Sequence, residues 1–324
     1  MDTIFFVSGV ALWILVSLVV VGRSIRWLGS LGRLEARDRW IVVTGCDSGF
    51  GLGVVEALVA RGARVLAYCY TEAGEARAKA AGAAATSRLD LTDGEARRVS
   101  VERVEALTGG QLWGVVHNAG RVDPGFVEYL SLDRYRAVME LNFFAIVDLT
   151  RRLVPPLAAA KGRVVLISSV DGIVSLPGNA PYDASKFALE AYADALRLEL
   201  GFRDIKVAVV NPSTMRTPLA LGFFEGHRAA WAEMAEREPT GPWRELYTPQ
   251  WLDEYVEVNT VNLERIAQDP KHTVEDIVHA LTAKRPRLRY LSGFAAKTLF
   301  RALWLMPERW SHAIKLGLIQ PPPR

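Results

Sequence analysis

Short apolar runs alternate with longer amphipathic stretches along most of the 324-residue chain. Runs rich in Val, Ile and Leu are typical of strands buried on both faces, whereas apolar positions spaced about three or four apart are typical of helices. The predicted strands are residues 40–44, 64–70, 87–91, 112–117, 163–168 and 205–210. The predicted helices are residues 50–61, 95–107, 135–157 and 182–202, with a further Ala/Glu/Arg-rich helix after the second strand.

Strands that alternate with helices imply right-handed crossovers and helices on both faces of one sheet. We therefore expect an α/β fold, a doubly wound parallel sheet of the Rossmann type, over residues 39–292. The long helix 135–157 should stop near Pro155 and Pro156, because proline cannot donate a backbone hydrogen bond. Beyond Pro212 the pattern loosens into a mostly helical, aromatic-rich region.

The first residues depart from this pattern. Residues 3–22 are uncharged and largely apolar, long enough to cross a bilayer as a helix. A cleaved signal peptide would begin with basic residues, but here Asp2 precedes the run and several arginines follow it. We predict a transmembrane helix at residues 1–24 and a basic linker at residues 25–38. Because positive residues concentrate on the cytoplasmic side, we expect a luminal N-terminus and a cytosolic main domain. The endoplasmic reticulum is the expected membrane, with the mitochondrial inner membrane as the alternative.

The last segment, residues 293–324, has an amphipathic pattern, with Lys297 and Arg301 opposite an apolar helical face. Such a helix suits the surface of a membrane rich in anionic lipid. A helix docked on the core or against a second copy in a homodimer fits the pattern equally well. The apolar face consists of Ala295, Leu299, Leu303 and Met306.

Charge and cysteine content exclude several classes of protein. The net charge of +3 is too small to indicate a nucleic-acid partner. Cys46 and Cys69 are the only cysteines, and no Cys/His cluster has zinc spacing, so we expect neither a disulfide framework nor a metal site. This composition favours a reducing compartment for the folded part.

A glycine-rich turn joins the first predicted strand to the first predicted helix. Glycines in this setting let the backbone approach a pyrophosphate, and the helix N-terminus supplies free N–H groups. Tight turns also need glycine for their own conformation, so the motif alone is a weak signal. The candidate residues are Gly45, Asp47, Ser48, Gly49, Phe50 and Gly51.

Further candidates for a dinucleotide follow the next strands. Asp90 and Leu91 come after the third strand, where Asp90 can accept a hydrogen bond from an adenine amino group or simply cap a helix. The small residues of Asn118-Ala119-Gly120 leave room for a ribose, although an ordinary turn would also use them.

The choice of nicotinamide cofactor depends on charge near the ribose. A 2′-phosphate needs basic residues, but the turn carries Asp47 and no base occurs after the second strand before Arg77. NAD is therefore favoured over NADP, with Thr71 standing where an acidic ribose ligand is often found.

Tyr182 and Lys186 stand four residues apart on a predicted helix and therefore share one face. A nearby ammonium favours the phenolate, so the pair can exchange a proton with an alcohol or ketone. Ser169 ends the fifth strand and can orient the substrate oxygen, and Asn142 can hold a water near Lys186. Each residue alone has an ordinary structural explanation.

Together, the glycine turn, Asn118-Ala119-Gly120, Asn142, Ser169, Tyr182 and Lys186 resemble the short-chain dehydrogenase/reductase family, in particular its membrane-associated branch. The resemblance implies that Tyr182 removes the hydroxyl proton while hydride passes from the carbinol carbon to the nicotinamide. It also implies that Lys186 holds the ribose, Ser169 binds the substrate oxygen and Asn142 completes the proton relay. Pro212 and Thr217 would lie at the nicotinamide.

Three positions depart from the family pattern. His117 replaces the commoner Asn, and Ser213 replaces the commoner Gly. Asp171 stands where small residues are usual and places a charge near the reacting centre.

The branch contains retinol, hydroxysteroid and 3-hydroxybutyrate dehydrogenases, so the resemblance leaves the substrate open. The aromatic residues after Pro212, including Phe223, Phe224 and Trp231, favour a hydrophobic alcohol of the retinoid or steroid kind, although they suit simple packing nearly as well. Arg216 is the best argument for the alternative, a hydroxy acid. A protein that binds NAD without turnover, as a sensor or scaffold, is an alternative of another class.

Overall fold

The computed structural model describes residues 17, 21 and 32–317. Within them, a parallel sheet of seven strands has the order β3-β2-β1-β4-β5-β6-β7. The strand order reverses between β1 and β4, which is where such sheets bind ligands beyond their carboxyl ends. The strands are β1 Trp40–Thr44, β2 Arg64–Cys69, β3 Ala85–Arg88, β4 Gly114–His117, β5 Arg163–Ile167, β6 Lys206–Pro212 and β7 Arg289–Ser292.

The predicted Rossmann-type sheet is confirmed, with two differences. Strand β3 begins and ends earlier than predicted, so that Asp90 lies in the loop after it. Strand β7 was not predicted, because its four residues directly follow a basic stretch and have no apolar run. Pairing with β6, from Val209–Arg289 to Pro212–Ser292, defines this strand more than its own sequence does.

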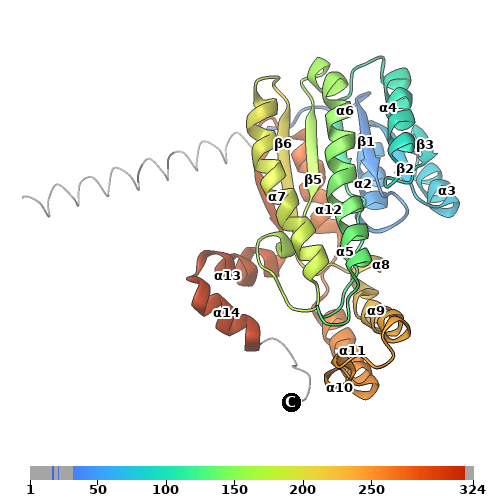
Figure 1. Ribbon diagram of the computed structural model, residues 1–324. Coiled ribbons are helices and arrows are strands. Elements are labelled where there is room, and N and C mark those ends of the chain that lie inside the picture. Colours follow the sequence, from blue (N-terminus) through green and yellow to red (C-terminus); the bar gives the residue numbers. More distant parts are fainter. Residues whose placement is uncertain (1–16, 18–20, 22–31, 318–324) are drawn as a thin grey trace, which may run out of the picture.

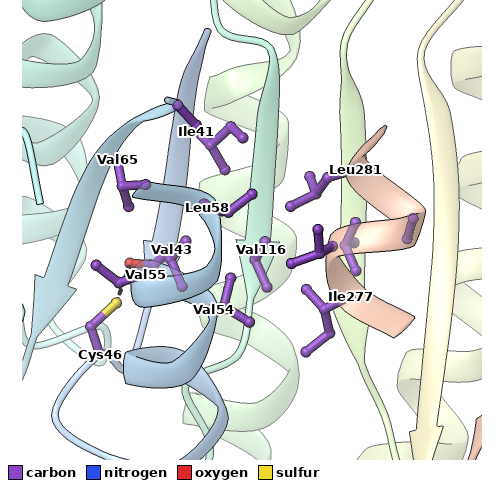
Figure 2. Packing of buried hydrophobic residues seen from close by; sticks show 14 of the residues in the cluster. Ile41, Val43, Cys46, Val54, Val55, Leu58, Val65, Val116, Ile277 and Leu281 are labelled. Carbon is purple, nitrogen blue, oxygen red and sulfur yellow. Dashed lines mark hydrogen bonds between the residues drawn. The ribbon is translucent and has the colours of Figure 1, made fainter. Parts of the chain in front are cut away.

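Helices α2 Gly49–Val59 and α12 Lys271–Thr282 cover one face of the sheet, and α3 Glu72–Ala80 lies at its β2–β3 end. Figure 2 shows side chains of α2 and α12 meeting those of the central strands. Val54 and Leu58 of α2 and Ile277 of α12 are fully buried there. Full burial of such side chains contributes roughly 1.5–3 kcal/mol each. The packing therefore holds α2 against the sheet and positions its first turn next to the glycine turn.

The opposite face is covered by α4 Gly94–Thr108, by a helical run from Leu132 to Ala159 and by α7 Ala180–Gly201 (Figure 1). The long run consists of α5 Leu132–Met139, a π-helical turn η1 Glu140–Phe144 and α6 Ala145–Ala159. The run was predicted to stop near Pro155 and Pro156, and α6 passes through both prolines and ends shortly after them at Ala159. Burial of Leu153, Pro156 and Leu157 against the sheet holds the last turn in place despite the missing donors.

Four helices follow β6 and lie beyond the carboxyl ends of the strands (Figure 1). They are α8 Pro218–Leu221, α9 Phe223–Arg237, α10 Trp243–Leu246 and α11 Pro249–Ile266. Their aromatic side chains pack with Phe126 and Tyr129 in a separate core, with ring centroids 5.1 Å apart for Tyr129 and Tyr247. Packing therefore explains much of the aromatic content of this region.

The predicted membrane anchor at residues 1–24 falls outside the described part of the chain, apart from positions 17 and 21. Across the described residues, every helix is too short or too polar to span a bilayer. The described end of the predicted linker packs on the domain: the Leu34 backbone N–H donates to Thr282 at 2.6 Å, and Ala36 is buried.

The C-terminal segment contains the π-helical turn η3 Ala296–Phe300, α13 Arg301–Leu305 and α14 Glu308–Gly317. The predicted apolar face is only partly correct, because the wider π turn rotates Leu299 outward while Leu303 packs on Ile173 and Val174. Exposed apolar side chains remain on the other faces.

Candidate active site

A cavity of about 840 Å³ opens beyond the carboxyl ends of the central strands. Most of the predicted site residues line it: Gly45, Asp47, Ser48, Gly49, Phe50, Asp90, Leu91, Asn118, Ala119, Gly120, Ser169, Tyr182, Lys186, Pro212 and Thr217. Gly51, Thr71 and Asn142 do not line it, but each contacts a residue that does. Residues far apart in the sequence thus meet in one site.

The glycine turn has the geometry of an anion cradle. Gly45 has φ +69°, and a Cβ there would lie 2.7 Å from the Ala119 Cα. Ser48 precedes α2 without using its side chain to cap the helix, and the first turn of α2 contains no acid. The N–H groups and positive dipole end of α2 therefore remain available to a pyrophosphate. These residues fit a dinucleotide.

Asp47 shapes the side of the turn next to β2. Its carboxylate accepts hydrogen bonds from the Tyr70 and Thr71 backbones, both at 2.8 Å, and from the Thr71 hydroxyl at 2.7 Å. Partial burial opposes ionisation, but these bonds outweigh it and lower the pKa of Asp47. Thr71 thus supports Asp47 and also caps α3. Arg77 donates to the Asp47 carbonyl at 2.9 Å, so a base lies closer to the turn than the sequence suggested.

Asn118 ties the ends of β1 and β4 together. Its amide donates to the carbonyls of Thr44 at 2.9 Å and Gly45 at 3.0 Å. Asp90 accepts from the Thr92 backbone at 2.8 Å, so it forms a local turn while lining the cavity, and Asp93 is the cap of α4. His117 is buried against Thr150 outside the cavity lining, and burial lowers its pKa to about 3.

Tyr182 and Lys186 lie on the first turns of α7, with the Lys186 Nζ 5.2 Å from the Tyr182 ring centroid. The ammonium donates to the Ile167 carbonyl at 2.8 Å, and burial lowers the pKa of Lys186 to about 8. Burial and the charge of Asp171 raise the pKa of Tyr182, against the effect of the Ser169 hydroxyl. The pKa of Tyr182 is therefore raised, and not lowered as expected from the neighbouring Lys186. When bound, an oxidised nicotinamide accepts hydride and its positive charge favours the phenolate.

Asn142 lies in the π turn η1 and is fully buried. Its oxygen accepts from the Arg121 backbone at 2.9 Å, and its amide donates to the Arg121 carbonyl at 2.9 Å and to the Ser185 hydroxyl at 3.0 Å. Both amide donors of the side chain are therefore used in joining the loop after β4 to α7. It positions the loop beside Lys186, and its side chain has no donor left for a water.

Sequence reasoning missed a buried network behind the candidate catalytic residues. The Asn211 amide donates to the Ser169 carbonyl at 2.8 Å and to Glu190 at 2.6 Å. Arg289 of β7 donates to Asn211 at 3.2 Å and pairs with Glu190. Glu190 follows Lys186 by one helical turn and counteracts the effect of burial on its pKa. The only signal in the sequence was this four-residue spacing.

The outer wall of the cavity is mainly apolar. Phe223 and Phe224, which the sequence singled out, line it together with Tyr255, whereas Trp231 packs in the separate aromatic core. Arg216 is exposed and donates to the Glu264 carbonyl at 3.0 Å, outside the cavity lining. Apolar lining residues that sequence reasoning missed are Leu176, Leu219, Leu263, Ile266 and Phe300.

The site combines an anion cradle with a buried tyrosine, lysine and serine. This combination is suited to proton transfer beside a bound nicotinamide. A model of the short chain dehydrogenase family matches residues 39–227. The chain therefore belongs to the short-chain dehydrogenase/reductase family, whose members are oxidoreductases acting on alcohols.

Its relatives include retinol and hydroxysteroid dehydrogenases. Retinol dehydrogenase 7 of Mus musculus is 34% identical over 274 residues, 84% of this chain and 85% of that protein. The 17-beta-hydroxysteroid dehydrogenase type 6 of Bos taurus is 32% identical over 277 residues, 84% of this chain and 86% of that protein. A solved short-chain dehydrogenase from Streptomyces avermitilis is 29% identical, with a TM-score of 0.66 over 87% of this chain and 95% of that chain.

Proposed function

We propose that the chain is an NAD-dependent dehydrogenase that interconverts a hydrophobic alcohol, of the retinoid or steroid kind, and its carbonyl compound. The observation that carries this proposal is the single cavity in which Ser169, Tyr182 and Lys186 face a mainly apolar wall. Each buried methylene of a substrate contributes about 0.8 kcal/mol, so a large apolar alcohol gains much more from this wall than a short one.

The relatives support the same substrate class, since their names describe retinol and 17-beta-hydroxysteroid dehydrogenases. The hydroxy acid alternative loses its main support, because Arg216 lies outside the cavity lining. Arg121 does line the cavity but pairs with Asp123 at 2.6 Å, which neutralises its charge. The intact Tyr182 and Lys186 argue against a sensor or scaffold without turnover.

NAD is the proposed cofactor. Asp47 is ionised beside the Thr71 backbone at the end of β2, and its negative charge would repel a ribose 2′-phosphate. Arg77 argues in the other direction, but its guanidinium is engaged with the Asp47 carbonyl and lies outside the cavity lining.

We also propose that the protein works at a membrane. The apolar run of residues 3–22 remains the predicted anchor, and the C-terminal helices expose apolar side chains that suit the surface of a bilayer. Cytosolic orientation at the endoplasmic reticulum, and a homodimer, remain predictions. The exposed side chains are Phe294, Leu299, Trp304, Leu305, Trp310, Ile314 and Leu316.

A substrate panel tests the proposed function. Full-length protein in detergent is assayed with NAD and NADP against retinoids, hydroxysteroids, 3-hydroxybutyrate and short alcohols, with Tyr182→Phe as the inactive control. We expect the highest kcat/KM for a retinoid or steroid with NAD. A higher value for 3-hydroxybutyrate than for every lipid alcohol would overturn the proposal in favour of the hydroxy acid.

A further inference from the structure

An additional carboxylate lies inside the active site. Asp171 belongs to the short 3₁₀ turn η2 Val170–Gly172, directly after Ser169, and its side chain lines the cavity beside Tyr182. The sequence already marked this acid as a departure from the pattern that the chain resembles. The catalytic roles assigned above make no use of it.

Ser169 and Asp171 are joined by two hydrogen bonds. The Ser169 hydroxyl donates to the Asp171 Oδ2 at 3.1 Å and accepts from the Asp171 backbone N–H at 3.1 Å. A hydroxyl has one proton, so while it points at Asp171 it cannot also donate to a substrate oxygen. Asp171 therefore changes what Ser169 can offer the reacting group.

The second oxygen of Asp171, Oδ1, has no hydrogen-bond donor among the described residues. The nearest cation that acts on the carboxylate is Lys186, but its ammonium donates to the Ile167 carbonyl. Oδ1 is not among the buried side-chain atoms without a partner, and Asp171 lines the cavity, so this oxygen is open to a donor group on a ligand.

The distance suits a group on the substrate next to the reacting carbon. A substrate oxygen held by Ser169 lies one hydrogen bond from the Ser169 Oγ, and Asp171 lies one further bond away, so the two are within about 6 Å. A hydroxyl or amino group on the neighbouring carbon falls between them. A carboxylate at the same place would meet a like charge.

We propose that Asp171 is a specificity-determining residue that accepts a hydrogen bond from a second donor group, a hydroxyl or an amine, carried by the substrate beside its reacting alcohol. This inference rests on the proposed function and narrows its substrate class to apolar molecules that carry a vicinal diol or amino alcohol. The donor satisfies Oδ1, and the Asp171 carboxylate at the same time selects against hydroxy acids.

Matched substrates and two variants test the proposal. The substrates are a long-chain secondary alcohol and its counterparts with a neighbouring hydroxyl, amino or carboxylate group. The protein is the full-length chain in detergent with NAD. We expect the wild type to prefer the diol or amino alcohol over the simple alcohol by at least about tenfold in kcat/KM, as expected for a hydrogen bond to a charged group.

Asp171→Leu should bring this ratio close to one while the simple alcohol is still oxidised, and it should raise activity on the carboxylate. Asp171→Asn keeps the shape and one acceptor, so it should lose preference for the amine more than for the hydroxyl. Asp194→Asn is the matched control. Asp194 is exposed on α7, lies outside the cavity lining and pairs with Arg197, so its variant should keep the wild-type ratio.

The outcomes separate this inference from the proposed function. Turnover of simple lipid alcohols with a wild-type ratio near one, or a ratio that Asp171→Leu leaves unchanged while thermal melting shows a folded protein, overturns the role of Asp171 alone. Absence of turnover on every lipid alcohol, with or without a donor group, overturns the proposed function itself.

Discussion

Gly51 offers a sharp test of the dinucleotide cradle, because it lies behind the turn and does not line the cavity. A Cβ at this position would lie 2.1 Å from the Gly45 carbonyl oxygen and 2.6 Å from the Asn118 Nδ2. Backbone and a hydrogen-bonded amide surround it, so neither neighbour can rotate away. Gly51→Ala must therefore displace the turn or break the bond between Asn118 and Gly45, which measures 3.0 Å.

The expected magnitude follows from these contacts. Overpacking costs about 1–3 kcal/mol, and loss of a buried hydrogen bond adds about 1 kcal/mol. If about 2 kcal/mol of this cost opposes the turn conformation that binds NAD, the Kd for NAD rises roughly thirtyfold.

Gly53→Ala is the matched control on the same helix. Its added Cβ would lie 3.0 Å from a terminal methyl group of Val274, which can shift, and alanine favours the helix by about 0.4–1 kcal/mol. Titration of both variants with NAD by quenching of intrinsic fluorescence, together with thermal melting, checks the prediction. An unchanged Kd for Gly51→Ala, or an equal loss in Gly53→Ala, would refute the reasoning.

Four further predictions address the remaining parts. Tyr182→Phe should lower kcat by at least about 10²-fold while the Kd for NAD stays within a few fold; a near-normal rate would remove Tyr182 from the chemistry. The kcat/KM should be higher with NAD than with NADP, and Asp47→Ser should lower the NAD-to-NADP ratio of kcat/KM by about tenfold. An NADP preference in the wild type would contradict the role of Asp47. Partial burial of Asp148 is outweighed by hydrogen bonds from three arginines, which lower its pKa from 3.8 to about 2. Its stabilising effect, about 2 kcal/mol, is therefore present above pH 3.8 and lost as the pH falls through about 2, so urea unfolding of Asp148→Asn should show this deficit at pH 7. A deficit below about 0.5 kcal/mol would mean that the ion pairs add nothing. Finally, protease added to intact microsomes should digest the catalytic domain, and full protection would reverse the predicted topology.

The sequence was sufficient for the sheet because its central strands are buried on both faces. Val42, Val43 and Val116 belong to continuous apolar runs without alternating polar residues. Such runs are recognisable as buried strands, so the order of strands and helices could be predicted. Strand β7 lacks such a run, so its pairing with β6 could not be anticipated. The last turn of α6 extends past Pro155 and Pro156 to Ala159 for a related reason, since the packing of Leu153 and Leu157 outweighs the local effect of the prolines.

The candidate catalytic residues Ser169, Tyr182 and Lys186 could be grouped from the sequence because proton transfer restricts the residue types, and the structure brings them to one cavity. The cavity wall could not be predicted, because a phenylalanine in the core and one at a substrate look alike in sequence. Phe224 lines the cavity, while Trp231, two turns further along the same face of α9, packs on Trp243 with ring centroids 5.6 Å apart. Only the path of the helices after β6 separates these two roles.

The unpredicted strand also changes how the catalytic centre is understood. Arg289 extends from β7 to Glu190 and Asn211, and Asn211 holds the carbonyl of Ser169. The same arginine lies 5.3 Å from the ring centroid of Trp304 on α13. The C-terminal helices therefore connect through Arg289 and Asn211 to Ser169, the candidate ligand of the substrate oxygen. If those helices meet a membrane as proposed, we expect the contact to act on the network that positions Ser169, and loss of the Arg289 contacts should change turnover more than the Kd for NAD.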